Sequence, residues 1–194
     1  MDERLRDQLA SLLETDSSAG AAGSGPLQTE AAVLVPIFAV DRELHILLTK
    51  RQQSLTHHAG EISFPGGRRD PNDATLLETA LREAEEEIGL PRESAQPLGG
   101  LRPTSTIVTN YVIHPYVAWI TPSTRWRTSP AEVSAVIQLP LRALGESAQQ
   151  VELTRAEHTF RTRAYLAPGH VIWGATARII DDLLSRAAPL LGAH

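Results

Sequence analysis

The stretch "FPGGRRDPNDATLLETALREAEEEIGL", residues 64–90, joins a glycine turn to a strongly acidic helix. Five of its carboxylates fall between Glu78 and Glu87. At about 100° per residue, Glu83, Glu86 and Glu87 share an arc of the helix roughly 100° wide. That arc borders the apolar stripe expected to face the core, which consists of Leu77, Ala80, Leu81, Ala84 and Ile88. The acidic arc is therefore expected beside the buried side of the helix, not on its far solvent face.

Crowding of this kind is unfavourable unless something neutralises the charges. Each like-charge pair one turn apart destabilises a helix by roughly 0.2–0.5 kcal/mol. A hard divalent cation would reverse the sign, because Mg²⁺ prefers carboxylate oxygens and often shares its coordination shell with substrate phosphates. On the helix alone, a solvated charged face remains an equal alternative. Arg82 can pair with Glu78, with Glu86, or with both at helical spacing.

The segment before the helix favours a ligand site. Gly66 and Gly67 leave the backbone bare, so its carbonyls or amides can come close to a ligand. Taken alone, the two glycines would indicate only a tight turn. Thr75 and Glu78 fit a capping box, which starts the helix at a fixed place after that turn.

Composition limits the remaining possibilities. With 194 residues and ordinary hydrophobic (42%) and charged (21%) fractions, the chain predicts one domain with a sizeable core. The net charge of −5 argues against broad nucleic-acid binding. The absence of cysteine excludes disulfides, thiolate metal sites and cysteine nucleophiles. The charged start, "MDERLRDQLASLLETD", is unlike a secretory signal, and no apolar run has the length of a membrane span, so we expect a cytoplasmic protein.

The chain divides into an N-terminal part, residues 1–28, and a domain over residues 29–194. Leucines at helical spacing predict an amphipathic helix over 2–14, and glycine and serine predict a flexible linker over 17–26. Removal of residues 1–26 is expected to leave the metal site and the sheet intact. The apolar stripe of the helix could nevertheless dock on the domain or on a second subunit of a homodimer.

Within the domain, strands cluster between two well-separated helices, a pattern that favours a mixed sheet with helices packed on it. Alternation and turn residues predict strands at 31–40 and 43–51 around an Asp41-Arg42 turn, a short strand at 61–67, strands at 111–120 and 132–141, and a hairpin at 158–173 around Pro168-Gly169. The helices are expected at 74–88 and 174–187.

The acidic stretch closely resembles the Nudix box. Gly67 stands at the start of the pattern, and "REAEEEIGL", residues 82–90, matches its second half at every fixed position. The first half departs from the pattern twice. Asp73 stands where the family usually has Glu, and the spacing to Arg82 is one residue longer than usual. Asp73 is therefore not assigned to the metal.

A second stretch is similar to the motif that precedes the box in bacterial coenzyme A pyrophosphatases. It is "LLTKRQQSLTHHAGEISFPGG", residues 47–67, which contains the Leu-Leu-Thr, Arg51, Leu55, Gly60 and Phe-Pro-Gly-Gly positions of that motif. The longer box, "EVSAVIQLPL" and "IWGATARII" are also similar to that subfamily. The resemblance covers roughly residues 31–185.

This resemblance implies a Nudix α/β/α sandwich and Mg²⁺- or Mn²⁺-dependent hydrolysis of the pyrophosphate bond of coenzyme A. The products would be 4′-phosphopantetheine and adenosine 3′,5′-bisphosphate. By the same resemblance Glu83 and Glu87 are the principal metal ligands, Glu86 is a ligand of a second ion or a proton acceptor, and Arg82 orients a glutamate. A carbonyl of Gly66 or Gly67 would complete the coordination shell. The box alone also fits hydrolysis of ADP-ribose or a dinucleotide, and a non-catalytic module is disfavoured because all three glutamates are present.

Substrate phosphates need cations, and four lie close in sequence to the box: Lys50, Arg51, Arg68 and Arg69. Arg51 is the leading candidate because it follows an apolar strand and precedes the glycine segment. Arg68 is a second candidate, although surface cations are common. The general base is not visible from spacing, so Glu83, Glu86 and the later Glu132 all remain open.

Overall fold

The computed structural model describes residues 2–13, 28–54, 60–106, 110–123, 125–155 and 158–192. The expected linker at 17–26 and residue Leu55 of the motif lie outside these ranges. Within the described ranges, no helix is long and apolar enough to cross a membrane.

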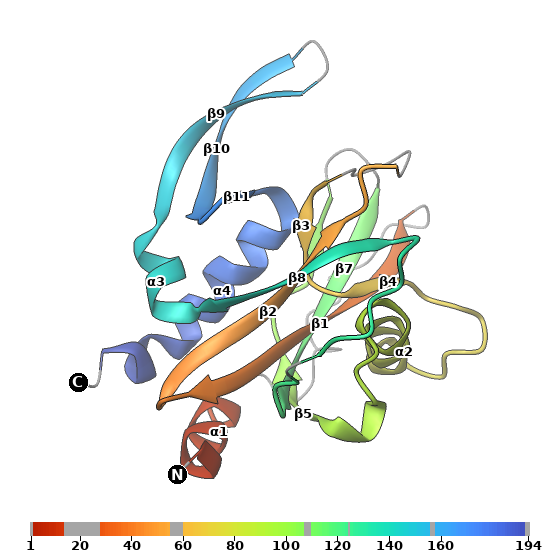
Figure 1. Cartoon of the computed structure of the whole chain (residues 1–194), viewed down its shortest axis with the longest axis vertical. Helices are drawn as coiled ribbons and strands as arrows, with labels where there is room; N and C mark the ends of the chain where they lie inside the picture. The colour runs from red at the N-terminus through yellow and green to blue at the C-terminus, as the bar shows by residue number, and fades with distance from the viewer. Residues whose placement is uncertain are drawn as a thin grey trace.

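The main sheet is built on two parallel central strands. These are β1 (Thr29–Val40) and β7 (Tyr111–Ile120), which pair from Thr29 with Tyr111 to Ile37 with Trp119. Strand β2 (Glu43–Arg51) runs antiparallel to β1 across the predicted turn. Asp41 and Arg42 both have positive φ, at 49° and 70°, as expected for the tight turn of a two-residue hairpin. Parallel and antiparallel pairs coexist, so the expected mixed sheet is confirmed (Figure 1).

The remaining strands of this sheet add to its edges. The predicted strand at 132–141 is present as β8 (Val133–Pro140), paired with β2. The single strand predicted at 61–67 is wrong, because Pro65 interrupts it. The segment forms β3 (Ile62–Ser63) on β2 and β4 (Gly66–Arg68) on β1. Two strands on β7 were not predicted, β5 (Ala95–Gly100) and β6 (Thr104–Ser105), and a 3-10 turn, Arg92–Ser94, precedes β5.

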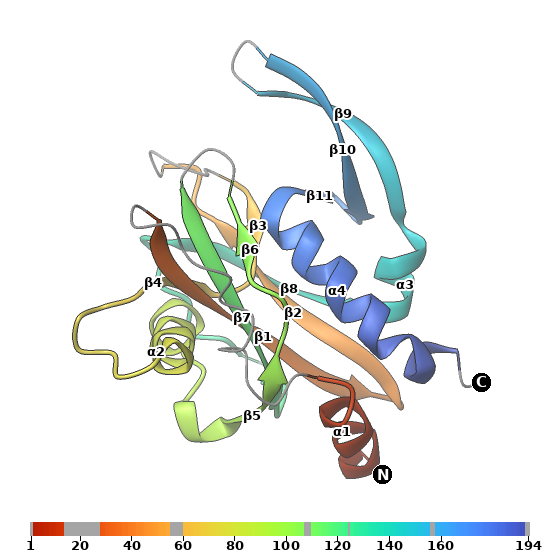
Figure 2. The ribbon, with the colours of Figure 1, turned by 180° about the vertical axis from the view of Figure 1, so that it is seen from behind.

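Helices cover both faces of this sheet (Figures 1 and 2). The acidic helix is α2 (Leu76–Ile88), which packs on alternate residues of β1 such as Ala32 and Leu34. Helix α4 (Gly174–Leu191) packs on the intervening residues, such as Val33 and Val35, and extends the predicted closing helix by one turn. Because β1 is buried on both faces, its sequence is continuously apolar. The expected α/β/α sandwich is confirmed.

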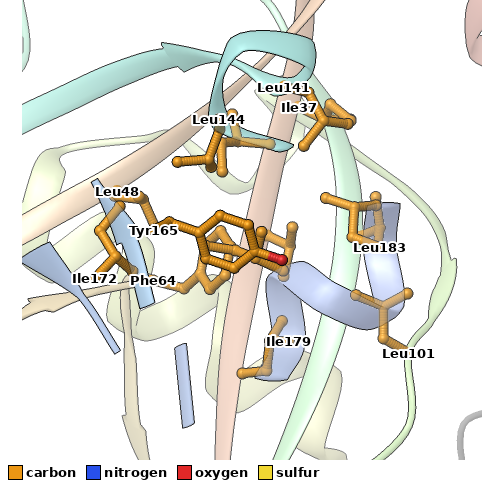
Figure 3. Packing of buried hydrophobic residues seen from close by; sticks show 14 of the residues in the cluster. Ile37, Leu48, Phe64, Leu101, Leu141, Leu144, Tyr165, Ile172, Ile179 and Leu183 are labelled. Atoms are coloured by element: carbon orange, nitrogen blue, oxygen red, sulfur yellow. The ribbon is translucent and has the colours of Figure 1, made fainter. Parts of the chain in front are cut away.

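A second, smaller sheet stands beside α4. The predicted hairpin forms between β10 (His158–Ala167) and β11 (His170–Ile172), and β10 also pairs with β9 (Ala148–Arg155), which was not predicted. A short helix, α3 (Leu141–Glu146), leads into this sheet. Tyr165 anchors it in the core (Figure 3). The Tyr165 hydroxyl donates a hydrogen bond to Asp181 of α4. Burial raises the pKa of Tyr165 to about 12.

The N-terminal helix, α1 (Asp2–Ala10), belongs to the core of the domain. It ends earlier than predicted. Leu9 is 0% exposed and Leu13 7% exposed, and both join the cluster beneath α4. The apolar stripe of α1 was expected to dock either on the domain or on a second subunit. In the structure it packs on the domain. Removal of residues 1–26 would therefore uncover core side chains, while the expectation that the sheet and the metal site stay intact remains a prediction.

Shortening one buried side chain of α1 measures how much this helix stabilises the domain. Leu9→Ala should lower the free energy of unfolding by roughly 2–4 kcal/mol, the usual cost of deleting a fully buried leucine side chain. The same substitution at Leu166, which is 38% exposed, should cost much less. Urea unfolding followed by circular dichroism gives both values. Similar costs for the two variants would mean that α1 does not stabilise the domain.

Candidate metal centre and active site

Both ends of α2 are fixed by caps, which sets the direction of every glutamate on it. At the start, Thr75 Oγ1 accepts a hydrogen bond from Glu78 N (3.1 Å), while Glu78 Oε2 accepts one from Ala74 N (2.7 Å). At the end, Gly89 adopts φ 67° and its N–H bonds back to the carbonyls of Ala84 and Glu85. The predicted capping pair is therefore present. Among the described contacts Arg82 does not pair with Glu78, because Glu78 turns toward the cap.

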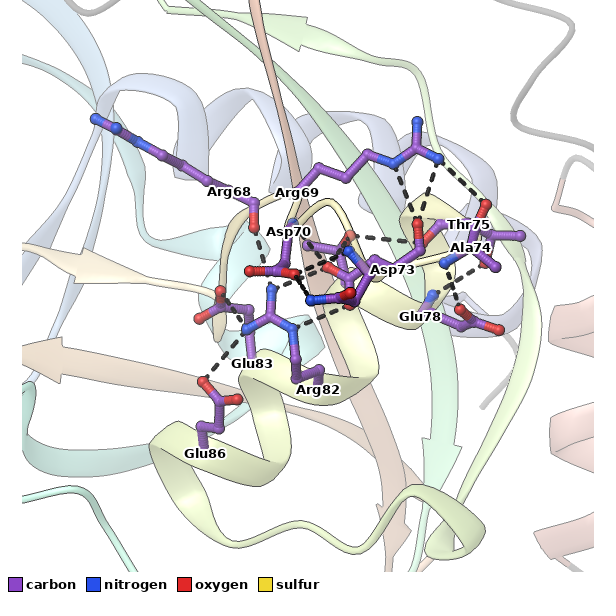
Figure 4. Close-up of polar contacts among 12 residues, drawn as sticks. Arg68, Arg69, Asp70, Asp73, Ala74, Thr75, Glu78, Arg82, Glu83 and Glu86 are labelled. Atoms are coloured by element: carbon purple, nitrogen blue, oxygen red, sulfur yellow. Dashed lines mark hydrogen bonds and ion pairs between the residues drawn. The ribbon is translucent and has the colours of Figure 1, made fainter.

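Arg82 is the centre of the polar network on this helix (Figure 4). Its Nε and Nη2 donate to the two oxygens of Asp73 at 3.1 and 3.0 Å, and Nη2 also donates to the carbonyl of Arg68. Its Nη1 donates to Glu83 Oε1 at 2.9 Å and to Glu86 Oε2 at 3.3 Å. One guanidinium thus holds two glutamates of the acidic arc, and the predicted pairing with Glu86 is present.

Asp73 is the buried partner that orients this guanidinium. It is 8% exposed, and Thr79 Oγ1 and the Asp70 amide also donate to it. The hydrogen bonds from Arg82 hold the pKa of Asp73 well below its usual range, against the opposing effect of burial. Asp73 also raises the pKa of Arg82, so both groups stay charged. The residue that departs from the box pattern thus supports Arg82.

The three box glutamates differ strongly in burial. Glu87 is 3% exposed, the Glu83 side chain 15% and the Glu86 side chain 60%, so the arc does border the buried side as predicted. Burial raises the pKa of Glu87 to about 8; the charge of Arg51 opposes this, and the charges of Glu83 and Glu132 add to it. Burial likewise raises the pKa of Glu83, against its bond to Arg82. Burial thus shifts both carboxyls in the same direction, toward the protonated form, and most strongly at Glu87.

Arg51 lies at this cluster, at the end of β2. Its Nη1 is 3.9 Å from Glu87 Oε1. Its Nε and Glu87 Oε2 are both buried with no hydrogen-bond partner in the described part of the chain. Buried polar atoms are normally satisfied, so these two atoms mark a place where a ligand would complete the bonding.

The other candidate cations are placed differently. The Arg68 guanidinium lies 5.1 Å from the centre of the Tyr111 ring and points away from the glutamates in Figure 4. Arg69 donates to the carbonyls of Asp73 and Ala74 and lies 3.6 Å from Glu30. Of the three candidate arginines, Arg51 is the one that the structure brings to a box glutamate. Arg68 and Arg69 contact other parts of the protein.

The glycine segment lets the Glu83 carboxylate approach the backbone of β4 closely. A Cβ atom on Gly67 would lie 2.4 Å from Glu83 Oε1, and one on Gly66 would lie 2.3 Å from the carbonyl oxygen of Ala32. Pairing of β4 with β1 fixes both glycines in place, with Gly67 opposite Ala32. Gly67 therefore lets the Glu83 carboxylate rest against bare backbone.

Gly67→Ala should displace that carboxylate without unfolding the chain. A side-chain end can move away from a new methyl group, but Glu83 would then leave its position beside Glu87. We expect kcat to fall by roughly 10–100-fold, as when a supporting contact of a metal ligand is lost. Gly192→Ala, where the new methyl would meet nothing closer than 3.8 Å, is the control. Steady-state kinetics at saturating Mg²⁺ test this, and an unchanged kcat for Gly67→Ala would contradict it.

A loop between β7 and β8 completes the site. Ser129 N donates to the carbonyl of Glu87 at 2.9 Å and Arg127 N to that of Ile88 at 3.2 Å, so the loop covers the end of α2. It carries Glu132, one of the three possible bases, close enough for its charge to raise the pKa of Glu83 and Glu87. Sequence analysis missed Ser129 and Arg127, because main-chain donors leave no signal in residue type.

The donor set suits a hard divalent ion, although it is not assembled around one. Carboxylate oxygens are the ligands that Mg²⁺ and Mn²⁺ prefer. Among the described residues, no three carboxylate or histidine side chains converge closely enough to hold an ion as they stand. Arg82 holds Glu83 and Glu86, whereas Glu87 faces Arg51. The buried Glu87 Oε2, which has no hydrogen-bond partner among the described residues, is the observation that fits a metal ligand.

Comparison with known families agrees with this geometry. The model of the NUDIX domain matches residues 28–161. The chain belongs to the Nudix family. A curated relative from Photorhabdus laumondii, named an uncharacterized Nudix hydrolase NudL, is 39% identical over 155 residues, covering 79% of this chain and 82% of the relative. The relative of the same name from Salmonella newport is 36% identical over 158 residues, covering 80% and 81%.

Solved Nudix structures share the fold at low identity. A MutT/nudix family protein from Enterococcus faecalis superposes with a TM-score of 0.59 at 17% identity. The match covers 86% of this chain but 64% of that protein, just under two thirds of its length. The NUDIX domain of Shewanella oneidensis NrtR, solved with ADP ribose, gives a TM-score of 0.50 at 22% identity, covering 68% and 88%. Nudix hydrolases generally use divalent ions such as Mg²⁺ or Mn²⁺.

Proposed function

We propose that this Nudix hydrolase cleaves the pyrophosphate bond of coenzyme A or a derivative, giving 4′-phosphopantetheine and adenosine 3′,5′-bisphosphate. The observation that carries the proposal is the contact between Arg51 and Glu87. Arg51 belongs to the motif at 47–67 that resembles the coenzyme A subfamily, and Glu87 belongs to the box. The contact supports the proposal because the cation proposed to select the substrate lies beside a carboxylate proposed to bind the metal.

Glu83, Glu86 and Glu87 would hold Mg²⁺ or Mn²⁺, with a carbonyl of Gly66 or Gly67 beside them. When bound, such an ion neutralises phosphate oxygens and activates water. Arg82 orients Glu83 and Glu86 by charge-assisted hydrogen bonds. Burial of Glu87 places its carboxylate in a less polar environment, which strengthens the attraction between the carboxylate and a bound cation.

Glu132 is the best placed of the three candidate bases. Glu83 Oε1 and Glu86 Oε2 each accept a hydrogen bond from Arg82, so one oxygen of each carboxylate is already engaged. No described residue forms an ion pair with the Glu132 carboxylate, and the side chain is half-buried beside the box glutamates. We therefore assign proton acceptance from the attacking water to Glu132.

Arg51→Ala tests the contact with substrate phosphate. Charge-assisted bonds to phosphate are stronger than neutral ones, so KM for coenzyme A should rise about tenfold or more, a loss of at least ~1.4 kcal/mol. If the ribose 3′-phosphate is the partner, KM for 3′-dephospho-coenzyme A should rise less. Kinetics at saturating Mg²⁺ separate this effect from altered metal binding. Arg161→Ala, on the distant β10, is the control. An equal rise in KM for both substrates would mean that Arg51 contacts the pyrophosphate and not the 3′-phosphate.

A panel of substrates tests the proposed function itself. kcat/KM is measured with Mg²⁺ for coenzyme A, 3′-dephospho-coenzyme A, ADP-ribose and a dinucleoside polyphosphate. The proposal predicts the highest value for coenzyme A or one of its derivatives. A higher value for ADP-ribose or the dinucleotide would favour the alternative, a Nudix hydrolase of another nucleoside diphosphate derivative.

A further inference from the structure

Gln52 holds the loop that carries Glu132 at two points. Its backbone N donates to the carbonyl of Glu132 at 2.8 Å, and its side-chain Nε2 donates to the carbonyl of Pro130 at 2.9 Å. The residue directly follows Arg51 at the end of β2. One residue thus links the strand that carries the substrate-binding cation to the loop that carries the proposed base.

The loop has further attachments through its main chain. Ser129 N donates to the carbonyl of Glu87, and the carbonyl of Ser129 accepts from Glu132 N (3.1 Å) and Val133 N (2.9 Å). Residues 129–133 therefore form a tight turn fixed to α2 at one end. At the other end, the amide of Gln52 is a side-chain attachment beside the hydroxyl of Ser134, which donates to the carbonyls of Lys50 and Arg51. A substitution of the Gln52 side chain therefore weakens the hold on Pro130 without removing a main-chain bond.

The bond from Gln52 to Pro130 lies outside the regular pairing of β2 with β8. Lys50 lies opposite Ala135, but Arg51 lies opposite Val133, so Ser134 is an extra residue in β8. Such a bulge disrupts the ladder of hydrogen bonds and bends the strand, and bulges are over-represented next to active sites. The side chain of Gln52 bonds to Pro130 just beyond this bulge, where the pairing of β2 with β8 ends.

We propose that Gln52 is a positioning residue that fixes Glu132 beside the box glutamates during pyrophosphate hydrolysis. The inference rests on the proposed role of Glu132 as the proton acceptor. The side-chain amide of Gln52 bonds to the carbonyl of Pro130, so its expected action on the reaction runs through Glu132. Loss of its amide should therefore lower kcat, leave KM unchanged, and have no effect once Glu132 is neutralised.

The test is a double-mutant cycle with Gln52→Met, Glu132→Gln and the combined variant. Methionine keeps the length of the side chain and carries no charge, but it cannot donate to Pro130. Gln52→Met should lower kcat about 10-fold or more, the scale for losing an outer-shell contact. The combined variant should have the kcat of Glu132→Gln alone. Gln138→Met, on the exposed face of β8, is the matched control.

Two measurements do not depend on turnover. Calorimetric affinity for Mn²⁺ should be the same in wild type and Gln52→Met. Hydrogen exchange should speed up over residues 127–134 and stay unchanged over α2.

The cycle is run with whichever nucleoside diphosphate derivative the wild type hydrolyses fastest, so a failure of the coenzyme A assignment leaves this test intact. The inference would be overturned if the two substitutions had additive effects on kcat or if Glu132→Gln kept full activity. It would also be overturned if Gln52→Met raised KM or left hydrogen exchange in the loop unchanged.

Discussion

Glu87→Gln is expected to lower kcat by roughly 10²–10³-fold, the scale for losing one preorganised charged group in a closed site. The carboxylate is nearly fully buried, and one of its oxygens has no partner in the described part of the chain. An amide of the same shape removes the charge that would hold the cation. Affinity for Mn²⁺, measured by calorimetry, should fall together with kcat.

The same variant should not destabilise the metal-free protein. Burial raises the pKa of Glu87 from 4.5 to about 8, so the folded state keeps a proton that the unfolded state releases above its own pKa. Stability from this group is present below the unfolded pKa and is lost as pH rises toward about 8. Glutamine does not titrate, so the metal-free variant should gain stability relative to wild type across that window.

Glu85→Gln is the matched control for both measurements. Glu85 stands two residues away on the same helix, is about half exposed, and pairs with Arg92 at 2.9 Å. Its neutralisation should leave kcat and Mn²⁺ affinity unchanged. If Glu87→Gln retained nearly full activity at limiting Mg²⁺, Glu87 would not be a metal ligand.

Arg82→Met should give the largest loss of stability together with loss of activity. The substitution leaves Asp73 buried without its main partner and frees Glu83 and Glu86. Removing one member of a buried ion pair typically costs about 3–5 kcal/mol. Methionine keeps much of the apolar stem, so the cost comes from the missing charge and its hydrogen bonds.

Arg92→Met provides the comparison, because the Arg92–Glu85 pair is solvent-exposed on both sides. Exposed pairs are worth about 0–1 kcal/mol. Urea unfolding of both variants gives the two costs directly. Equal costs would show that the Arg82 network contributes no more than a surface pair and does not fix the glutamates.

The acidic helix was predictable because helical periodicity alone sets which side chains share a face. Ala80, Ala84 and Ile88 are buried and the glutamates border them, as the spacing required. The Thr75 cap and the Asp41-Arg42 turn were likewise predictable, since each depends on neighbouring residues. Interactions within a few residues leave a signal in the sequence that tertiary packing does not erase.

The missed features depend on contacts between distant segments. Strand β9 begins with "AQQ", which is no strand pattern by itself, and becomes a strand by pairing with β10. Asp73 could be excluded from the metal set by its spacing, but its bond to Arg82 required the fold. The approach of the Glu132 loop to α2 uses main-chain groups, which every residue type carries, and so it could not be predicted.

The most direct test of the central claim is product analysis with coenzyme A and Mg²⁺, comparing wild type with Glu83→Gln by mass spectrometry. The account predicts 4′-phosphopantetheine and adenosine 3′,5′-bisphosphate from the wild type, and almost none of either from Glu83→Gln at equal protein concentration. Equal product formation by the two proteins, or no cleavage of coenzyme A by a wild type that hydrolyses ADP-ribose, would contradict it.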